Sequence, residues 1–148
     1  MKSELYNYRP IAAKGLQYFS LIITGLIIIF FCSLIQHVVI PMEQRDFSHF
    51  LNYNFTKTAA IIFFITGFLI GNFSQLNPWY TGICLFLVFP LTSLIEGTIN
   101  KGSHNLIPFE FIMYFMYALP SIIAAFMGRF IRRQIANQKE KDEDKVVN

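Results

Sequence analysis

Residues 15–36 read GLQYFSLIITGLIIIFFCSLIQ and contain no formally charged side chain. A transmembrane helix needs about 20 consecutive, predominantly apolar residues to cross the hydrocarbon core of a bilayer. This stretch reaches that length, and Thr24 and Gly25 interrupt its apolar character only mildly. The sequence therefore predicts a membrane-spanning helix over residues 15–36.

A secretory signal peptide is the competing interpretation of this stretch. The apolar run is longer than the hydrophobic region of a signal peptide, and residues 36–39, QHVV, offer no small-residue cleavage signature. We therefore expect the segment to remain in the protein as a spanning helix.

The composition of the whole chain agrees with a membrane protein. Of its 148 residues, 54% are hydrophobic and only 14% are charged, whereas about a quarter are charged in an ordinary soluble domain. The high apolar content excludes intrinsic disorder. Cys32 and Cys84 are isolated in apolar runs, which excludes a disulfide scaffold.

Three more helices follow from the positions of charges and turn residues. The charge-free interval 58–95 is too long for one helix, and the turn-rich residues 72–78 divide it into helices at about 54–71 and 79–96. A last apolar run at 108–131 begins with Pro108 and ends among arginines, as suits a helix N-terminus and C-terminus.

The predicted fold is all-α, a four-helix transmembrane bundle within residues 15–133. A cytoplasmic N-terminal tail, residues 1–14, precedes it, and a charged C-terminal tail, residues 134–148, follows it and is expected to be disordered. A faint internal repeat relates residues 25–73 to residues 82–130 at an offset of 57. If real, this repeat makes the bundle two repeated helical hairpins.

The distribution of Lys and Arg predicts the orientation in the membrane. Nine of these twelve residues lie in the N-terminal tail or from Arg129 onward, and the other three are Arg45, Lys57 and Lys101. Because positive charge is retained inside, both termini are expected in the cytoplasm. The small size and hairpin layout favour the bacterial cytoplasmic membrane.

Polar and small residues recur at steps of three and four along the last helix, and so share one face. They are Glu110, Tyr114, Tyr117, Ser121, Ala124 and Gly128. We expect this stripe to face the bundle and the opposite face to contact lipid, the latter carrying Phe111, Phe115, Ile122 and Phe126. On helix 79–96, Thr92 and Glu96 share a face, which would bring Glu96 near Glu110 at the outer boundary.

All three histidines, His37, His49 and His104, fall on the predicted outer side. Together with nearby carboxylates they are candidates for a metal site or a proton-linked site. No HxxxH or HExxH spacing is present, and polar residues must gather in outer loops in any case, so the nature of such a site stays open. The hypothetical ligand or ion pocket comprises Glu96, Glu110, His104, Tyr114, Tyr117 and Ser121.

Two further patterns concern packing and lipid. Gly67 with Gly71, and Ala124 with Gly128, have the four-residue spacing that lets helix backbones approach, either within the chain or in a homodimer. Arg129, Arg132 and Arg133 at the cytoplasmic end of the last helix are candidates to contact anionic lipid headgroups.

No motif of an enzyme is present. The thiols lack a CxxC partner, and phosphate-binding glycine loops are absent, so we expect no cofactor and no catalysis, with an intramembrane enzyme left open. The net charge of +3 resides mainly at membrane ends, which argues against nucleic-acid binding. Two hypotheses remain: a small oligomeric transporter or permeation unit with an outward-facing polar pocket, or a non-catalytic accessory or assembly subunit of a larger membrane complex.

Overall fold

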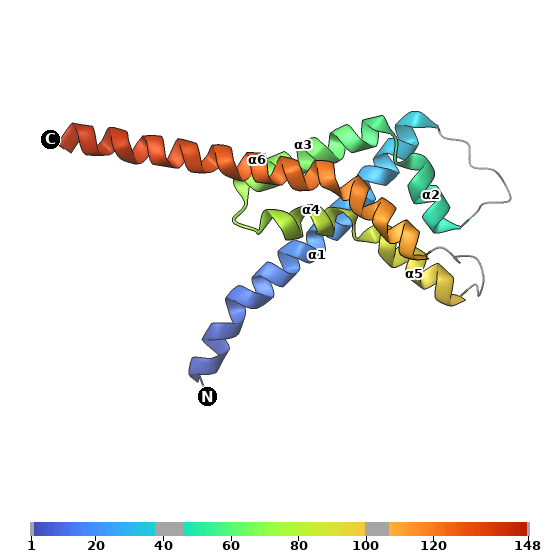
Figure 1. The fold of residues 1–148 in the computed structure, drawn as a ribbon. Helices are drawn as coiled ribbons and strands as arrows, with labels where there is room; N and C mark the ends of the chain where they lie inside the picture. The colour runs from blue at the N-terminus through green and yellow to red at the C-terminus, as the bar shows by residue number, and fades with distance from the viewer. Residues whose placement is uncertain (1, 38–45, 100–106, 148) are drawn as a thin grey trace.

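A computed structural model describes residues 2–37, 46–99 and 107–147, and these residues form six α-helices and no strand (Figure 1). This confirms the predicted all-α class. The helices are α1 (Lys2–Gln36), α2 (Phe47–Asn54), α3 (Lys57–Phe73), α4 (Pro78–Phe86), α5 (Val88–Ile99) and α6 (Ile107–Val147).

Two of the helices contain a segment long and apolar enough to cross a membrane, Ala13–Gln36 in α1 and Phe109–Lys139 in α6. The pairs α2–α3 and α4–α5 pass the same test only when each pair is taken together, across bends of 85° and 44°. By length and composition, the described residues therefore provide two candidate spans, and up to four if each bent pair is one span.

Helix α2 replaces part of what the sequence predicted as an outer loop, and the following helix begins at Lys57 instead of residue 54. The signal for α2 was the spacing of Phe47, Phe50 and Leu51 directly after Asp46, which is the residue that precedes the helix. Helix α2 has only eight residues, and half of them are polar or histidine, so hydrophobic periodicity was too short to reveal it.

The single helix predicted at 79–96 is divided into α4 and α5. Proline has no backbone N–H, and its ring clashes with the carbonyl four residues earlier, so Pro90 disrupts the helix at Phe86. In the structure, α4 ends at Phe86. The Leu87 amide donates a hydrogen bond of 3.3 Å to the Cys84 carbonyl, three residues earlier, which tightens the final turn. The proline therefore explains the position of the 44° bend.

Both ends of the chain differ from the predicted tails, because α1 begins at Lys2 and α6 continues to Val147. Residues 134–147 contain no glycine or proline and are rich in Gln, Lys and Glu, which are strong helix formers. Charge composition predicted disorder there, but local helix propensity favours continuation of a helix already established. The ends of α1 and α6 project away from the packed helices in Figure 1.

Helices α3 and α6 lie side by side (Figure 1), and glycines bring their backbones close together. A Cβ atom at Gly67 would lie 2.6 Å from the Ser121 carbonyl oxygen, and one at Gly71 would collide with the Ala125 carbonyl. From the other helix, a Cβ at Gly128 would collide with the Phe68 carbonyl. This contact is possible only because these positions have no side chain.

The two halves of the suggested repeat bend at different places. In residues 25–73 the break separates α2 from α3, within the second apolar segment, whereas in residues 82–130 it separates α4 from α5, within the first. The halves therefore do not share one arrangement of helix breaks.

Candidate functional site

The two ends of the packed helices differ in chemistry. We call the "α2 end" the end that holds α2, the C-termini of α1 and α5 and the start of α6; the "termini end" holds the α3–α4 turn and the side from which the ends of the chain project (Figure 1). Polar side chains of interest gather at the α2 end.

Five residues of the α2 end form a hydrogen-bonded group that we call the polar cluster: Ser48, Asn52, Ser93, Glu96 and Tyr114. The Tyr114 hydroxyl lies 2.7 Å from Ser93 Oγ and accepts a hydrogen bond from Asn52 Nδ2 at 3.3 Å. Tyr114 and Ser93 are both buried. The cluster therefore connects α2 to α5 and α6.

Glu96 holds α2 by its N-terminus. Its carboxylate accepts a hydrogen bond from the Ser48 amide nitrogen, which lies 3.1 Å from Oε1 and 3.3 Å from Oε2. The first amides of a helix have no partner within the helix and carry the positive end of its dipole, so a carboxylate is favoured there. The Asp46 side chain makes no capping hydrogen bond, so Glu96, distant in sequence, provides this interaction instead.

Several buried polar atoms near the polar cluster have no hydrogen-bond partner among the described residues. They are both amide atoms of Gln36, His49 Nδ1, Asn52 Oδ1, Asn54 Oδ1 and Thr56 Oγ1. Buried polar atoms in folded proteins are nearly always bonded to protein, water or ligand. Among the described residues, the α2 end therefore has hydrogen-bonding capacity left for water or a small polar ligand.

The structure brings only part of the predicted pocket together. Glu96 and Tyr114 belong to the polar cluster, and Glu110 is half-buried in the first turn of α6 at the same end. His104 lies outside the described residues. Ser121 is fully buried further along α6, where its hydroxyl donates to the Ala118 carbonyl at 2.9 Å.

An aromatic block separates Ser121 from the polar cluster. It consists of Phe55, Phe63, Phe86, Phe89 and Tyr117, and Tyr117 stands between Tyr114 and Ser121 along α6. The Tyr117 ring centroid lies 4.4 Å from that of Phe55, and the Phe63 and Phe86 centroids are 4.3 Å apart. One member of the predicted polar stripe of α6, Tyr117, is therefore packed against a phenylalanine ring.

The candidate metal ligands do not gather within the described part of the chain. His37 is exposed and follows α1, while His49 belongs to α2, with Nδ1 at 3.8 Å from Asp46 Oδ2. Among residues 2–37, 46–99 and 107–147, no group of three or more His, Cys, Asp or Glu is placed to hold a metal ion.

Of the four residues predicted on the lipid-facing side of α6, three are exposed and one is buried. Phe111, Phe115 and Phe126 are exposed, but Ile122 is buried. Ile122 packs directly against Gly82 of α4, where the absent side chain leaves room for it. Helix α4 thus covers a part of α6 that the periodicity assigned to lipid.

Sequence reasoning missed Ser48, Asn52 and Ser93. A signal for Ser93 was present, because it lies four residues after Phe89 and three before Glu96, on the face that they share. The sequence pattern instead indicated Thr92, whose hydroxyl donates a hydrogen bond to the Phe89 carbonyl of its own helix. Ser48 and Asn52 could not be placed because their helix was not predicted.

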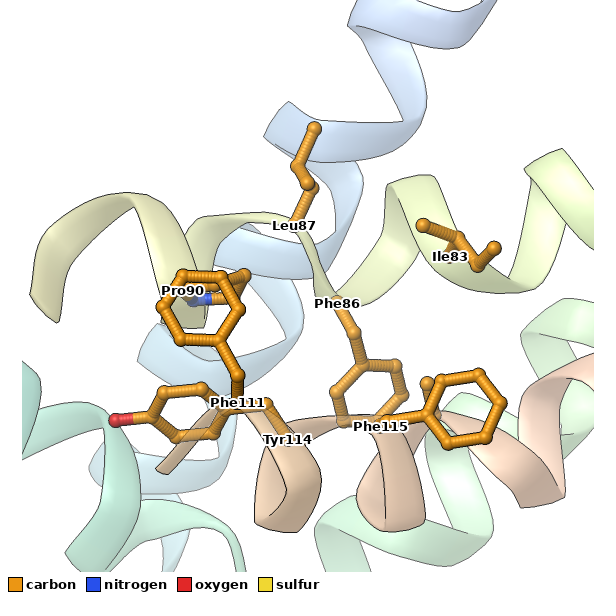
Figure 2. Close-up of a pocket in the computed structure, with 8 residues that line it drawn as sticks. Ile83, Phe86, Leu87, Pro90, Phe111, Tyr114 and Phe115 are labelled. Carbon is orange, nitrogen blue, oxygen red and sulfur yellow. The ribbon is translucent and has the colours of Figure 1, made fainter. Parts of the chain in front are cut away.

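An apolar pocket of about 250 Å³ adjoins the polar cluster, between the α4–α5 break and α6 (Figure 2). Its lining residues are Ile83, Phe86, Leu87, Pro90, Phe111, Tyr114, Phe115 and Ala118. Figure 2 shows the Tyr114 hydroxyl directed away from the other labelled side chains. The pocket suits an apolar group, because every other lining side chain is a hydrocarbon and Tyr114 directs its hydroxyl away from them.

The Tyr114 hydroxyl gives a direct test of the polar cluster. Tyr114→Phe leaves Ser93 Oγ and Asn52 Nδ2 without this partner, so we expect the free energy of unfolding to fall by about 1 kcal/mol. Tyr80→Phe is the matched control, because Tyr80 is exposed and its hydroxyl makes no hydrogen bond to a described residue. Equal effects of the two changes would contradict a stabilising role for the cluster.

Comparison with known proteins gives no assignment: no family model, curated protein or solved structure matches this chain significantly.

Proposed function

We propose that the chain is a polytopic integral membrane protein that crosses the bilayer four times with both termini in the cytoplasm. Helix α3 has 17 residues, at the lower limit for a span, and α4 and α5 contribute 9 and 12 residues to another. Helix α3 then forms one span, with α2 at a bend of 85° lying across the α2 end, and α4 with α5 forms another span. The excess of Lys and Arg at the termini end supports the orientation.

We further propose that it is a non-catalytic accessory or assembly subunit of a larger membrane complex. The observation that carries this proposal is the aromatic block, because packed rings surround Tyr117 at the level of the stripe that a permeation path would have to pass. The polar cluster is engaged in holding α2 on α5 and α6. Two of the residues predicted to line a transport pocket, Glu96 and Tyr114, thus have a structural use.

The projecting part of α6 offers a docking surface for such a complex. Residues 133–139 are all exposed, and they include Ile135, an apolar residue with 58% of its surface exposed, among polar neighbours. An accessory subunit needs a surface that its own fold leaves uncovered. This helix supplies one without disturbing the packed helices.

Purification of the full chain from native-level expression in mild detergent tests the proposal. A photo-crosslinking residue at Ile135 should capture one foreign protein that also copurifies in stoichiometric amount. The same residue at Ile123, which is exposed on the apolar part of α6, is the matched control. Recovery of the chain alone, or only as a homo-oligomer, would contradict an accessory role.

A small transporter or permeation unit is the second candidate, favoured by buried polar atoms at the α2 end that have no hydrogen-bond partner within residues 2–37, 46–99 and 107–147. Four helices are few for a complete pathway, so a homo-oligomer would be required. A flux assay in proteoliposomes tests this candidate. If the protein is a transporter, ions or solute should move faster than in empty vesicles, and Glu96→Gln or Glu110→Gln should reduce that flux. Flux equal to that of empty vesicles, across a broad panel, would contradict this candidate.

A further inference from the structure

A second pocket lies at the termini end, where α6 passes the α3–α4 turn. It measures about 300 Å³ and is lined by Ser74, Gln75, Arg129, Arg132, Arg133 and Ala136. The three arginines and Ala136 follow one another at helical spacing, so they share one face of α6. Arg132 Nη1 donates to the Ser74 carbonyl at 2.9 Å and fixes that face against the turn.

The charge of this basic pocket is not neutralised by the described side chains. No carboxylate among them lies within ion-pair distance of Arg129, Arg132 or Arg133. Guanidinium groups match the geometry of phosphate oxygens and bind them through paired hydrogen bonds. Ala136 has a small side chain, which leaves space beside the arginines. The pocket therefore has the charge, donors and room for a phosphate group.

Aromatic residues place the basic pocket at the level of lipid headgroups. Trp79 and Tyr80 are both about half exposed at the start of α4, and the Asn77 amide donates to the Tyr18 hydroxyl at 3.3 Å. Trp and Tyr with this exposure favour the membrane–water interface. The Trp79 ring packs edge-on against Phe126, with centroids 5.6 Å apart, and Arg129 follows Phe126 by about one helical turn.

We propose that the basic pocket binds the phosphate group of an anionic membrane phospholipid. The inference rests on the proposed membrane location, which puts headgroups beside the arginines. Arg129 and Arg133 contact the phosphate, while Arg132 connects the pocket to the α3–α4 turn. A soluble phosphate would offer the same oxygens, and the experiment separates the two sources.

Trp79 is the only tryptophan of the chain, so its fluorescence reports on the lipid beside the basic pocket. The full chain is reconstituted in mixtures of phosphatidylcholine and phosphatidylglycerol, with bromine on the acyl chains of one lipid at a time. Brominated phosphatidylglycerol should quench Trp79 more strongly than its mole fraction alone explains. In the Arg129→Gln/Arg133→Gln variant, the preference for phosphatidylglycerol should fall about fivefold for each arginine removed.

The double variant Lys14→Gln/Lys139→Gln is the matched control, because both lysines are exposed near the same end and the same charge is removed. It should retain most of the preference. The proposal that the basic pocket binds lipid would be overturned if the preference for phosphatidylglycerol were equal in all three proteins, or lost equally in both variants. If no brominated lipid quenches Trp79, the membrane location itself is contradicted, which is a distinguishable result.

Excess inorganic phosphate, compared with chloride at equal ionic strength, separates the two sources of phosphate. An arginine-dependent preference for phosphatidylglycerol that survives inorganic phosphate supports lipid as the ligand. Complete displacement of the lipid by inorganic phosphate would overturn the assignment to lipid, because the pocket would then bind free phosphate.

Discussion

Gly71→Leu should lower the free energy of unfolding by about 3 kcal/mol, the upper end of the range for overpacked sites. A Cβ at Gly71 meets the Ala125 carbonyl, which is backbone and cannot rotate away as a side chain would. Helices α3 and α6 must then separate along their contact. Reversible unfolding in mixed detergent micelles, followed by Trp79 fluorescence, measures the change.

Gly15→Leu is the control for this change. A Cβ at Gly15 meets no atom within 4 Å beyond its neighbours and the backbone of its own helix, so this variant keeps the wild-type stability or gains slightly from the higher helix propensity of leucine. If Gly71→Leu unfolded like the wild type but altered the oligomeric state, the glycine would belong to a contact between chains, and the packing of α3 on α6 would be contradicted.

Phe63→Ala should lower the free energy of unfolding by about 3 kcal/mol through loss of packing in the aromatic block. Phe63 is fully buried, and its ring centroid lies 4.3 Å from that of Phe86 and 6.0 Å from that of Phe55. In a bilayer, a buried ring stabilises chiefly by close packing, because lipid solvates apolar groups as well as protein does. The cost therefore lies at the lower end of the range known for buried phenylalanine.

Phe73→Ala, on the same helix, is the matched control. Phe73 is 79% exposed, so its truncation removes little contact within the protein, and the same unfolding measurement should show a change of less than about 1 kcal/mol. Comparable losses in the two variants would mean that the aromatic block is not the packed core that the structure describes.

Strong apolar periodicity made part of the fold predictable from sequence. Residues 15–36 have no charge to interrupt them and form a single helix. The stripe of α6 was recognisable because side chains three and four apart share a face, and Tyr114 and Ser121 are both buried. Where many residues repeat one pattern, local sequence determines the structure.

Short or long-range features escaped prediction for physical reasons. Helix α2 has eight residues and is held by Glu96, which lies 48 residues after Ser48 in the chain. The burial of Ile122 depends on the absence of a side chain at Gly82, on another helix. The packing of Tyr117 likewise depends on Phe55. Each feature is set by a distant residue that local periodicity does not identify.

Single-cysteine labelling tests the central claim, four spans with both ends in the cytoplasm, most directly. In a Cys32→Ala/Cys84→Ala background, one cysteine replaces Thr98, Gln75 or Gln138, all of which are exposed. A membrane-impermeant maleimide on intact spheroplasts should label the Thr98→Cys protein. It should label the Gln75→Cys and Gln138→Cys proteins only after the membrane is disrupted. Labelling of Gln75→Cys in intact spheroplasts would show that the α3–α4 turn is not cytoplasmic and would contradict the four-span account.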